Sequence, residues 1–169
     1  MMTSEGTAQT GSENLADPLR VSFLRALQTQ AYNAGIYESF AQLFQGYEGS
    51  LAVIFRRMAT EELRYGTKLE RCYCNQFGAL PNKEPKAVIE LPGLAASQHS
   101  ILDHVRTLEQ ALTTALHVAE RAQNFYARVA FQTPNSELQR IYQGLAQLGG
   151  IHLRLLQEKL ASFTDFTAR

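Results

Sequence analysis

Cysteine is scarce in this sequence and neither sign of charge is in excess, and these absences exclude several classes of protein. Only two cysteines are present, Cys72 and Cys74, and they lie too close together to frame a disulfide-rich secreted scaffold. Sixteen Lys and Arg residues balance sixteen Asp and Glu residues, so the chain shows no electrostatic footprint for nucleic acid or anionic lipid. No apolar run approaches the ~18–20 residues that a membrane span requires. We therefore expect a soluble, cytoplasmic protein that neither binds nucleic acid nor inserts into a membrane.

The motifs of the common enzyme classes are absent as well. The sequence contains no Gly-rich phosphate-binding loop, no nucleophile elbow and no zinc-spaced set of Cys and His residues. Cys72 and Cys74 would point about 200° apart on a helix, so they cannot readily pair or bind one metal together. Their role stays open.

A length of 169 residues is typical of one domain. Residues 1–16 are small and polar and lack the basic start and apolar centre of a signal peptide. We therefore expect a disordered N-terminal tail at 1–16, a folded domain at 17–163 and a C-terminal tail at 164–169.

Apolar residues recur at alternating steps of three and four in four stretches, which predicts four helices of roughly 25–32 residues and no strands. The four stripes run from Leu19 to Phe44, from Leu51 to Cys72, from Ile101 to Val129 and from Leu138 to Leu160. Asp17-Pro18 and Thr133-Pro134 each supply an N-cap residue followed by proline at the first helical position. A spacing near 3.5 favours near-aligned helix packing, so the pattern predicts an all-α, four-helix bundle.

The connections between the helices predict the topology. The breaks at residues 46–49 and 132–135 are short, so the first two helices and the last two helices form antiparallel hairpins. The linker at residues 78–98 contains three prolines and cannot stay helical. Its length reaches ~66 Å when extended, against ~39 Å for a helix of ~26 residues. Two antiparallel hairpins joined by one long crossover is the connectivity of ferritin-like folds.

Four polar residues fall on the inward stripes near the midpoints of their helices: Gln30, Glu62, Tyr65 and His152. The midpoints share one level in this topology, so we expect one buried polar cluster. A buried carboxylate must be paired, protonated or bound to a metal. The cluster is therefore either a hydrogen-bonded layer that fixes the register of the helices or a metal site.

The second half of the chain, ALHVAERAQNFYARVAFQTPNSELQRIYQGLAQLGGIHLRLLQEKL, resembles the rubrerythrin branch of the ferritin-like superfamily. The first half, in ALQTQAYNAGIY and MATEELRYGTKLE, looks like the same helical hairpin once more, so the resemblance covers residues 19–162. It implies a bundle in which four carboxylates and two imidazoles hold two iron ions. The first and third helices would each carry a Glu seven residues before an aromatic pair, and the second and fourth a Glu-x-x-His.

Four of the six implied ligand positions hold other residues here: Gln30 and Ala119 on the first and third helices, Tyr65 on the second and Gly149 on the fourth. Only Glu62 and His152 match the family pattern. Neither an amide nor the side chains of alanine and glycine can supply the negative charge that two hard cations require. The resemblance therefore implies a degenerate di-iron site.

Other acidic residues lie beside the inward stripes. Glu120 is one residue, about 100°, from the inward position, while Glu38 and Glu61 lie on helix flanks where we expect solvated side chains. The residues that could still hold one metal ion are Glu62 and His152, with Tyr65 or Glu120.

The residues that stand at the other four ligand positions also predict which side chains fill the centre of the bundle. Glycine costs roughly 1 kcal/mol relative to alanine inside a helix, so Gly149-Gly150 predicts either a bulky neighbour, Tyr65 or Tyr32, or a kink. A Tyr65 ring in the vacated space could bond Glu62 or a nearby imidazole and complete a network that needs no iron.

Taken together, these patterns favour a rubrerythrin-like protein that has lost most of its di-iron ligands and serves as a non-catalytic binding or structural bundle. Such a protein needs no cofactor and could form a homodimer or bind a protein partner. The alternative is an iron-dependent oxidoreductase of the same type, acting on peroxide, dioxygen or Fe(II). A third interpretation is a bundle whose centre accepts a small apolar ligand.

Overall fold

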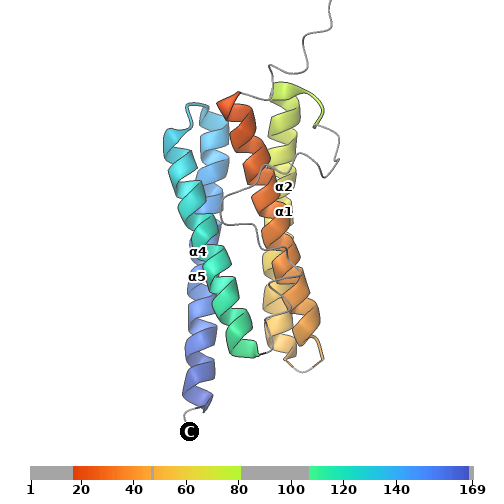
Figure 1. Cartoon of the computed structure of the whole chain (residues 1–169), viewed down its shortest axis with the longest axis vertical. Coiled ribbons are helices and arrows are strands. Elements are labelled where there is room, and N and C mark those ends of the chain that lie inside the picture. Colours follow the sequence, from red (N-terminus) through yellow and green to blue (C-terminus); the bar gives the residue numbers. More distant parts are fainter. Residues whose placement is uncertain (1–16, 47, 81–106, 168–169) are drawn as a thin grey trace, which may run out of the picture.

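Four long helices dominate the computed structural model, which describes residues 17–46, 48–80 and 107–167. In chain order they are α1 (Pro18–Phe44), α2 (Gly49–Phe77), α4 (Leu108–Gln132) and α5 (Ser136–Thr167), as Figure 1 shows. Their lengths are 27, 29, 25 and 32 residues. The described residues contain no strand. The all-α prediction is therefore confirmed.

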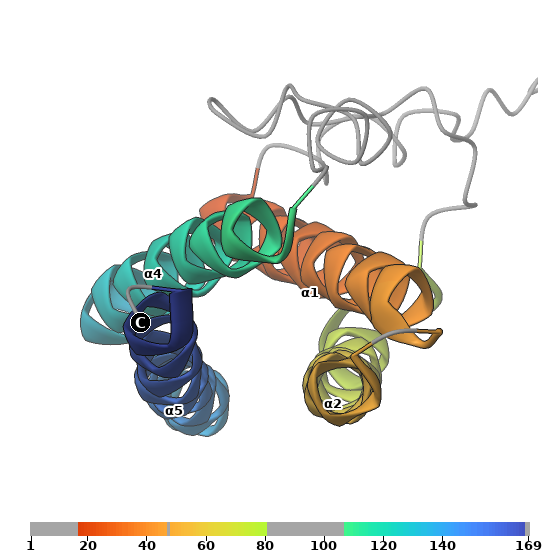
Figure 2. The same cartoon turned by 90° about the horizontal axis from the view of Figure 1, so that it is seen from below.

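The helices pair in chain order, so that α1 packs along α2 and α4 along α5. Viewed along the bundle, α1 of the first hairpin lies beside α4 of the second, with α2 and α5 on the other side (Figure 2). The two predicted hairpins are confirmed. The expected N-terminal tail, most of the linker at 78–98 and the expected start of the third stripe at Ile101 lie outside the described residues. The last helix continues to Thr167 and so extends into the segment that the sequence predicted to be a C-terminal tail.

Side chains at the helix starts satisfy backbone N–H groups that would otherwise lack partners. Asp17 accepts a hydrogen bond from the Leu19 backbone N at 2.9 Å, and a proline follows it at the first helical position, as predicted. The start of α5 differs from the prediction, because Asn135 Oδ1 accepts a hydrogen bond from the Leu138 backbone N at 2.9 Å. Thr133 is instead the residue that ends α4.

Apolar side chains fill the bundle on both sides of its middle. The first cluster surrounds Phe40, Phe44 and Phe55 near the α1–α2 turn. The second cluster surrounds Phe23 and Tyr73 at the opposite end. Polar residues occupy the level between these two clusters, and the helices therefore position one polar layer across the core. No helix in the described ranges is long and apolar enough to cross a membrane.

Candidate functional site

Helix α1 contributes three polar residues to the middle of the bundle. Gln30, Asn33 and Tyr37 follow one another at steps of three and four, which places them on one helix face. They are 1%, 3% and 0% exposed, respectively. Gln30 was predicted from the sequence and Asn33 was not. The spacing of three and four residues from Gln30 and Tyr37 would have predicted Asn33 on the same helix face.

Helices α2 and α5 meet at a histidine held between two carboxylates. His152 Nε2 lies 2.9 Å from Glu61 Oε2, and His152 Nδ1 lies 3.4 Å from Glu62 Oε1. An ionised carboxylate can only accept a hydrogen bond, so Nε2 donates to Glu61. The longer contact is within ion-pair range but does not form a hydrogen bond. His152 and Glu62 are almost fully buried, whereas the Glu61 side chain is 24% exposed.

The electrostatics of Glu61 reflect these contacts. Burial raises the pKa of its carboxyl group, but hydrogen bonds from His152 and Arg57 lower the pKa more, and the net result lies below the usual value. The Arg57 Nε atom donates to Glu61 Oε1 at 3.0 Å. Glu61 therefore stays ionised and available to accept the imidazole N–H. The expectation of a solvated flank residue was wrong, because α2 turns this flank toward α5 rather than toward water.

Helix α4 contributes a tyrosine that bonds to α1. Gln30 Nε2 donates to the Tyr126 hydroxyl at 2.9 Å, and that hydroxyl donates to the Ala26 carbonyl oxygen at 3.1 Å. Burial raises the pKa of Tyr126 well above its usual value, and the charge on Glu62 raises it further, while the hydrogen bond from Gln30 opposes the shift. The phenol therefore stays neutral and acts as a hydrogen-bonding link between the two hairpins.

Tyr37 lies against the same imidazole. Its ring centroid is 5.7 Å from that of His152, and the two rings meet edge to face. Burial raises the pKa of Tyr37 well above its usual value, and the nearby Glu62 charge adds to the shift. The site therefore places phenols that remain neutral beside the carboxyl groups of helix α2.

Five buried polar atoms of this layer have no hydrogen-bond partner among the described residues: Gln30 Oε1, Asn33 Nδ2, Tyr37 OH, Glu62 Oε2 and His152 Nδ1. More than nine in ten buried polar atoms in native proteins are hydrogen-bonded. The polar layer therefore contains more hydrogen-bonding atoms than its side chains pair with one another.

Two residues considered with this cluster lie elsewhere. Tyr65 is partly buried, with its hydroxyl against Gly144 and the Lys68 ammonium 4.4 Å from its ring centroid. Glu120 is exposed on α4. The structure thus brings Gln30, Glu62 and His152 into one buried layer and places Tyr65 and Glu120 outside it.

The two glycines in α5 have a different neighbour from the expected one. A Cβ atom added at Gly149 would lie 3.0 Å from Gln123 Cβ and 3.1 Å from the backbone Cα and N of that residue. A Cβ atom added at Gly150 would meet only the end of the Gln123 side chain, at 3.0 Å. Close approach of α4, rather than a ring from Tyr65 or Tyr32, therefore explains why Gly149 has no side chain.

Among the residues that the structure describes, no three or more His, Cys, Asp or Glu side chains are arranged to hold one metal ion. The two carboxylates approach opposite ring nitrogens of His152 instead of converging with it on a common point.

The part of the chain that contains this layer matches a known protein family. Residues 26–160, which run from within α1 to within α5, match the family model described as Rubrerythrin. No curated protein matches the sequence.

Proposed function

The chain belongs to the rubrerythrin family of ferritin-like proteins, and we propose that it is a member whose di-iron site has given way to a structural or ligand-binding bundle. The observation that carries this proposal is the Glu61–His152–Glu62 arrangement, in which the imidazole faces a carboxylate at each of its nitrogens. Two side chains that could ligate a metal, His152 and Glu61, are hydrogen-bonded to each other. The layer then acts as a cross-link between helices α2 and α5.

The donor set does not fit a pair of iron ions. The resemblance implies four carboxylates and two imidazoles, whereas this chain supplies one of each at the matching positions, Glu62 and His152. Gln30 is neutral and is bonded to Tyr126. One carboxylate, even with Glu61 beside it, cannot neutralise two hard divalent or trivalent cations. We therefore propose no reaction on a pair of iron ions for this chain.

Packing on the second hairpin supports the same proposal. A glutamate at position 149 would need a Cβ atom 3.0–3.1 Å from three atoms of Gln123, two of them in the backbone. Interiors are packed closely enough that such a contact forces the helices apart. A carboxylate side chain at this position therefore requires α4 to move away from α5 by a few tenths of an ångström.

A second candidate function, an iron-dependent oxidoreductase acting on peroxide, dioxygen or Fe(II), is favoured by one observation. Glu62 Oε2 and Gln30 Oε1 are buried oxygen atoms without a partner among the described residues. Oxygen atoms of this kind, with His152, are donors that a single iron ion accepts. In this alternative His152 would offer its unpartnered Nδ1 atom, while its Nε2 atom stays bonded to Glu61.

Metal loading separates the two candidates. The full chain, stripped with a chelator, is incubated anaerobically with excess Fe(II), freed of unbound metal and submitted to elemental analysis. The test variant is Glu62→Gln/His152→Gln, and the matched control is Glu120→Gln, which changes an exposed carboxylate on α4. We expect well below one iron per chain in all three proteins.

The opposite results are equally clear. One iron per chain in the wild type and the control, lost in the double variant, would establish the alternative. Two irons per chain would overturn the proposal altogether. Circular dichroism of each protein checks that the helices remain folded, so that loss of metal is not confused with loss of fold.

The proposal also includes a homodimer or a protein partner, and no nucleic acid. The balanced charge of the chain supports a partner other than nucleic acid. A homodimer or a protein partner is part of the proposal, because the exposed side chains Leu63 and Ile151 are apolar and a partner could cover them. Light scattering of the full chain over a range of concentrations tests for the homodimer.

A further inference from the structure

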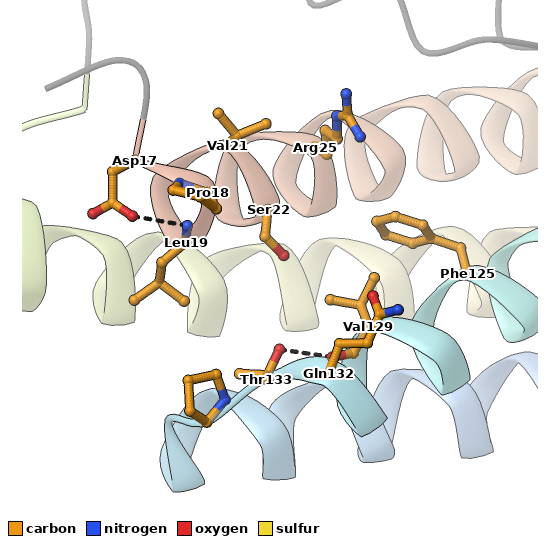
Figure 3. A pocket seen from close by; sticks show the side chains of 11 residues that line it. Asp17, Pro18, Leu19, Val21, Ser22, Arg25, Phe125, Val129, Gln132 and Thr133 are labelled. Carbon is orange, nitrogen blue, oxygen red and sulfur yellow. Dashed lines mark hydrogen bonds between the residues drawn. The ribbon is translucent and has the colours of Figure 1, made fainter. Parts of the chain in front are cut away.

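A cavity separate from the polar layer opens between the start of α1 and the end of α4. Its volume is about 600 Å³. Figure 3 shows Ser22 on α1 directed toward α4, with Phe125 and Val129 on α4 at the facing side. The volume falls within the ~300–1,000 Å³ typical of small-molecule sites. The cavity is therefore large enough for a compact organic molecule.

The walls of the cavity are mainly apolar. Leu19 and Val21 line it from α1, and Phe125 and Val129 line it from α4. Pro134 closes the end at the α4–α5 turn. A hydrocarbon chain or a ring would be desolvated by these groups at about 25 cal/mol per Å² of apolar area removed from water.

The polar groups in the lining differ in whether they are already bonded. The Asp17 carboxylate accepts the Leu19 backbone N–H. The Ser22 hydroxyl lies 3.0 Å from the Tyr142 hydroxyl, and the Thr133 hydroxyl donates to the Val129 carbonyl oxygen at 2.7 Å. These three groups are satisfied within the protein and do not call for a ligand.

The two remaining polar residues of the lining are Gln132, which is exposed, and Arg25. The Arg25 side chain lines the cavity, and its Nε atom is buried without a hydrogen-bond partner. No carboxylate among the described residues forms an ion pair with it. A guanidinium carries donors in a planar fork that matches a carboxylate, and bonds of this kind are about twice as strong as neutral ones. The cavity thus presents one cationic donor at the edge of an apolar surface.

We propose that this cavity binds a small amphipathic carboxylate, with the carboxylate group on Arg25 and the apolar part between Phe125, Val129 and Leu19. Asp17, which also lines the cavity, accepts the Leu19 backbone N–H and forms no ion pair with Arg25. This inference is independent of the polar layer and does not depend on whether the chain binds iron. The two sites differ in location, since the cavity lies at the α1 start and the layer at mid-bundle.

Calorimetric titration of the full chain with three probes of equal chain length tests the charge requirement. The probes are octanoate, octanol and octylammonium, each below its aggregation concentration. We expect octanoate to bind at least about tenfold more tightly than octanol, because a hydrogen bond to a charged group contributes that much or more. We expect octylammonium to bind more weakly than octanol. Equal binding of all three probes, or binding of none at millimolar concentration, would overturn the proposal.

Variants locate the site. Arg25→Gln should weaken octanoate binding about tenfold and leave octanol binding unchanged, while Arg25→Lys should recover part of the loss. The matched control is Arg128→Gln, which makes the same change of charge at an exposed position on α4 outside the cavity. Val129→Trp should fill the cavity and abolish binding of both probes. Octanoate binding that is unaffected by Arg25→Gln, or equally weakened by Arg128→Gln, would contradict the assignment.

A spectroscopic measurement on the wild-type chain locates the site even if the variants fold poorly. Amide chemical shifts of the wild-type chain on addition of octanoate should change at residues 18–25 and 125–134 and remain unchanged around His152. Shifts centred on the polar layer instead would show that the ligand enters the bundle centre and would refute this location.

Discussion

The first hairpin (α1 and α2) and the second hairpin (α4 and α5) contribute differently to the middle of the bundle. The first hairpin supplies a surplus of polar groups, several of them without a partner among the described residues. The second supplies two, His152 and Tyr126, which contact the first hairpin through Glu61 and Gln30. Nearer the start of α1, Tyr142 of the second hairpin contacts Ser22. Where the family pattern expects a carboxylate on α5, the second hairpin has a glycine and packs its own helices tightly.

This contrast indicates that polar contacts hold the two hairpins to each other more than they hold either hairpin together. Within each hairpin, the extensive contacts of α1 with α2 and of α4 with α5 hold the two helices together. Loss of a polar group on the second hairpin should therefore cost more stability than loss of an unpartnered group on the first.

The largest expected effect comes from His152→Ala. This change leaves the buried carboxylate of Glu62 without its imidazole neighbour and opens a cavity, so we expect a loss of about 3–5 kcal/mol in the free energy of unfolding. Urea denaturation followed by circular dichroism measures the change. The exposed control Glu120→Ala should stay within about 0.5 kcal/mol of the wild type.

A double variant sharpens this test. Glu62→Leu/His152→Leu removes both partners of this contact and fills the volume with apolar side chains, which is often neutral or stabilising for a buried pair. We expect it to be more stable than His152→Ala alone. A His152→Ala variant that loses less than about 1 kcal/mol would show that the histidine does not link the hairpins.

The next largest effect separates the two glycines of α5. Gly149→Ala places a Cβ atom 3.1 Å from the Gln123 backbone, which cannot move independently, so we expect a loss of about 1–3 kcal/mol. Gly150→Ala meets only the mobile end of the Gln123 side chain, and the better helix propensity of alanine should offset the crowding to within about 1 kcal/mol. Thermal denaturation of both variants measures the difference. Equal stabilities would mean that α4 and α5 can separate slightly at no cost.

These glycines show why part of the site could not be predicted from the sequence. The apolar period and the turn residues were sufficient to predict four helices and two hairpins, because both are local signals. The neighbour of Gly149 depends on how closely α4 approaches α5, and the helical period does not determine that distance. Glu61 was misassigned for a related reason: α2 faces both α1 and α5, so its buried face is wider than one stripe.

The starts of α4 and α5 carry side-chain signals that the predicted helix bounds did not use. Helix α4 begins after Thr107, whose side chain forms a capping box with Gln110 three residues later. Asn135 stands directly before the first residue of α5 and is a preferred N-cap. The expectation of Thr133 as the cap of the last helix relied instead on the proline that follows it.

A smaller effect compares two buried tyrosines. Tyr126→Phe removes the bonds to Gln30 and to the Ala26 carbonyl oxygen, leaving both groups without this partner, and we expect a loss of about 1–2 kcal/mol. Tyr37→Phe removes a hydroxyl that has no partner among the described residues, so we expect almost no change. Urea denaturation of both variants, side by side, measures the contrast. A larger loss for Tyr37→Phe would mean that its hydroxyl has a partner that these contacts do not include.

The smallest effect concerns alkaline pH and the contact between Tyr142 and Ser22. Burial raises the pKa of Tyr142 to about 12, while the hydrogen bond with Ser22 partly opposes the shift. Because the folded-state pKa exceeds the unfolded value of about 10, the neutral phenol contributes stability that is fully present below pH ~10 and is lost as the pH rises through 12. Tyrosine absorbance near 295 nm should show one fewer late-titrating group in Tyr142→Phe than in the wild type. The variant should also lose less stability between pH 10 and 12, and an identical pH dependence in the two proteins would show that this phenol does not link the hairpins.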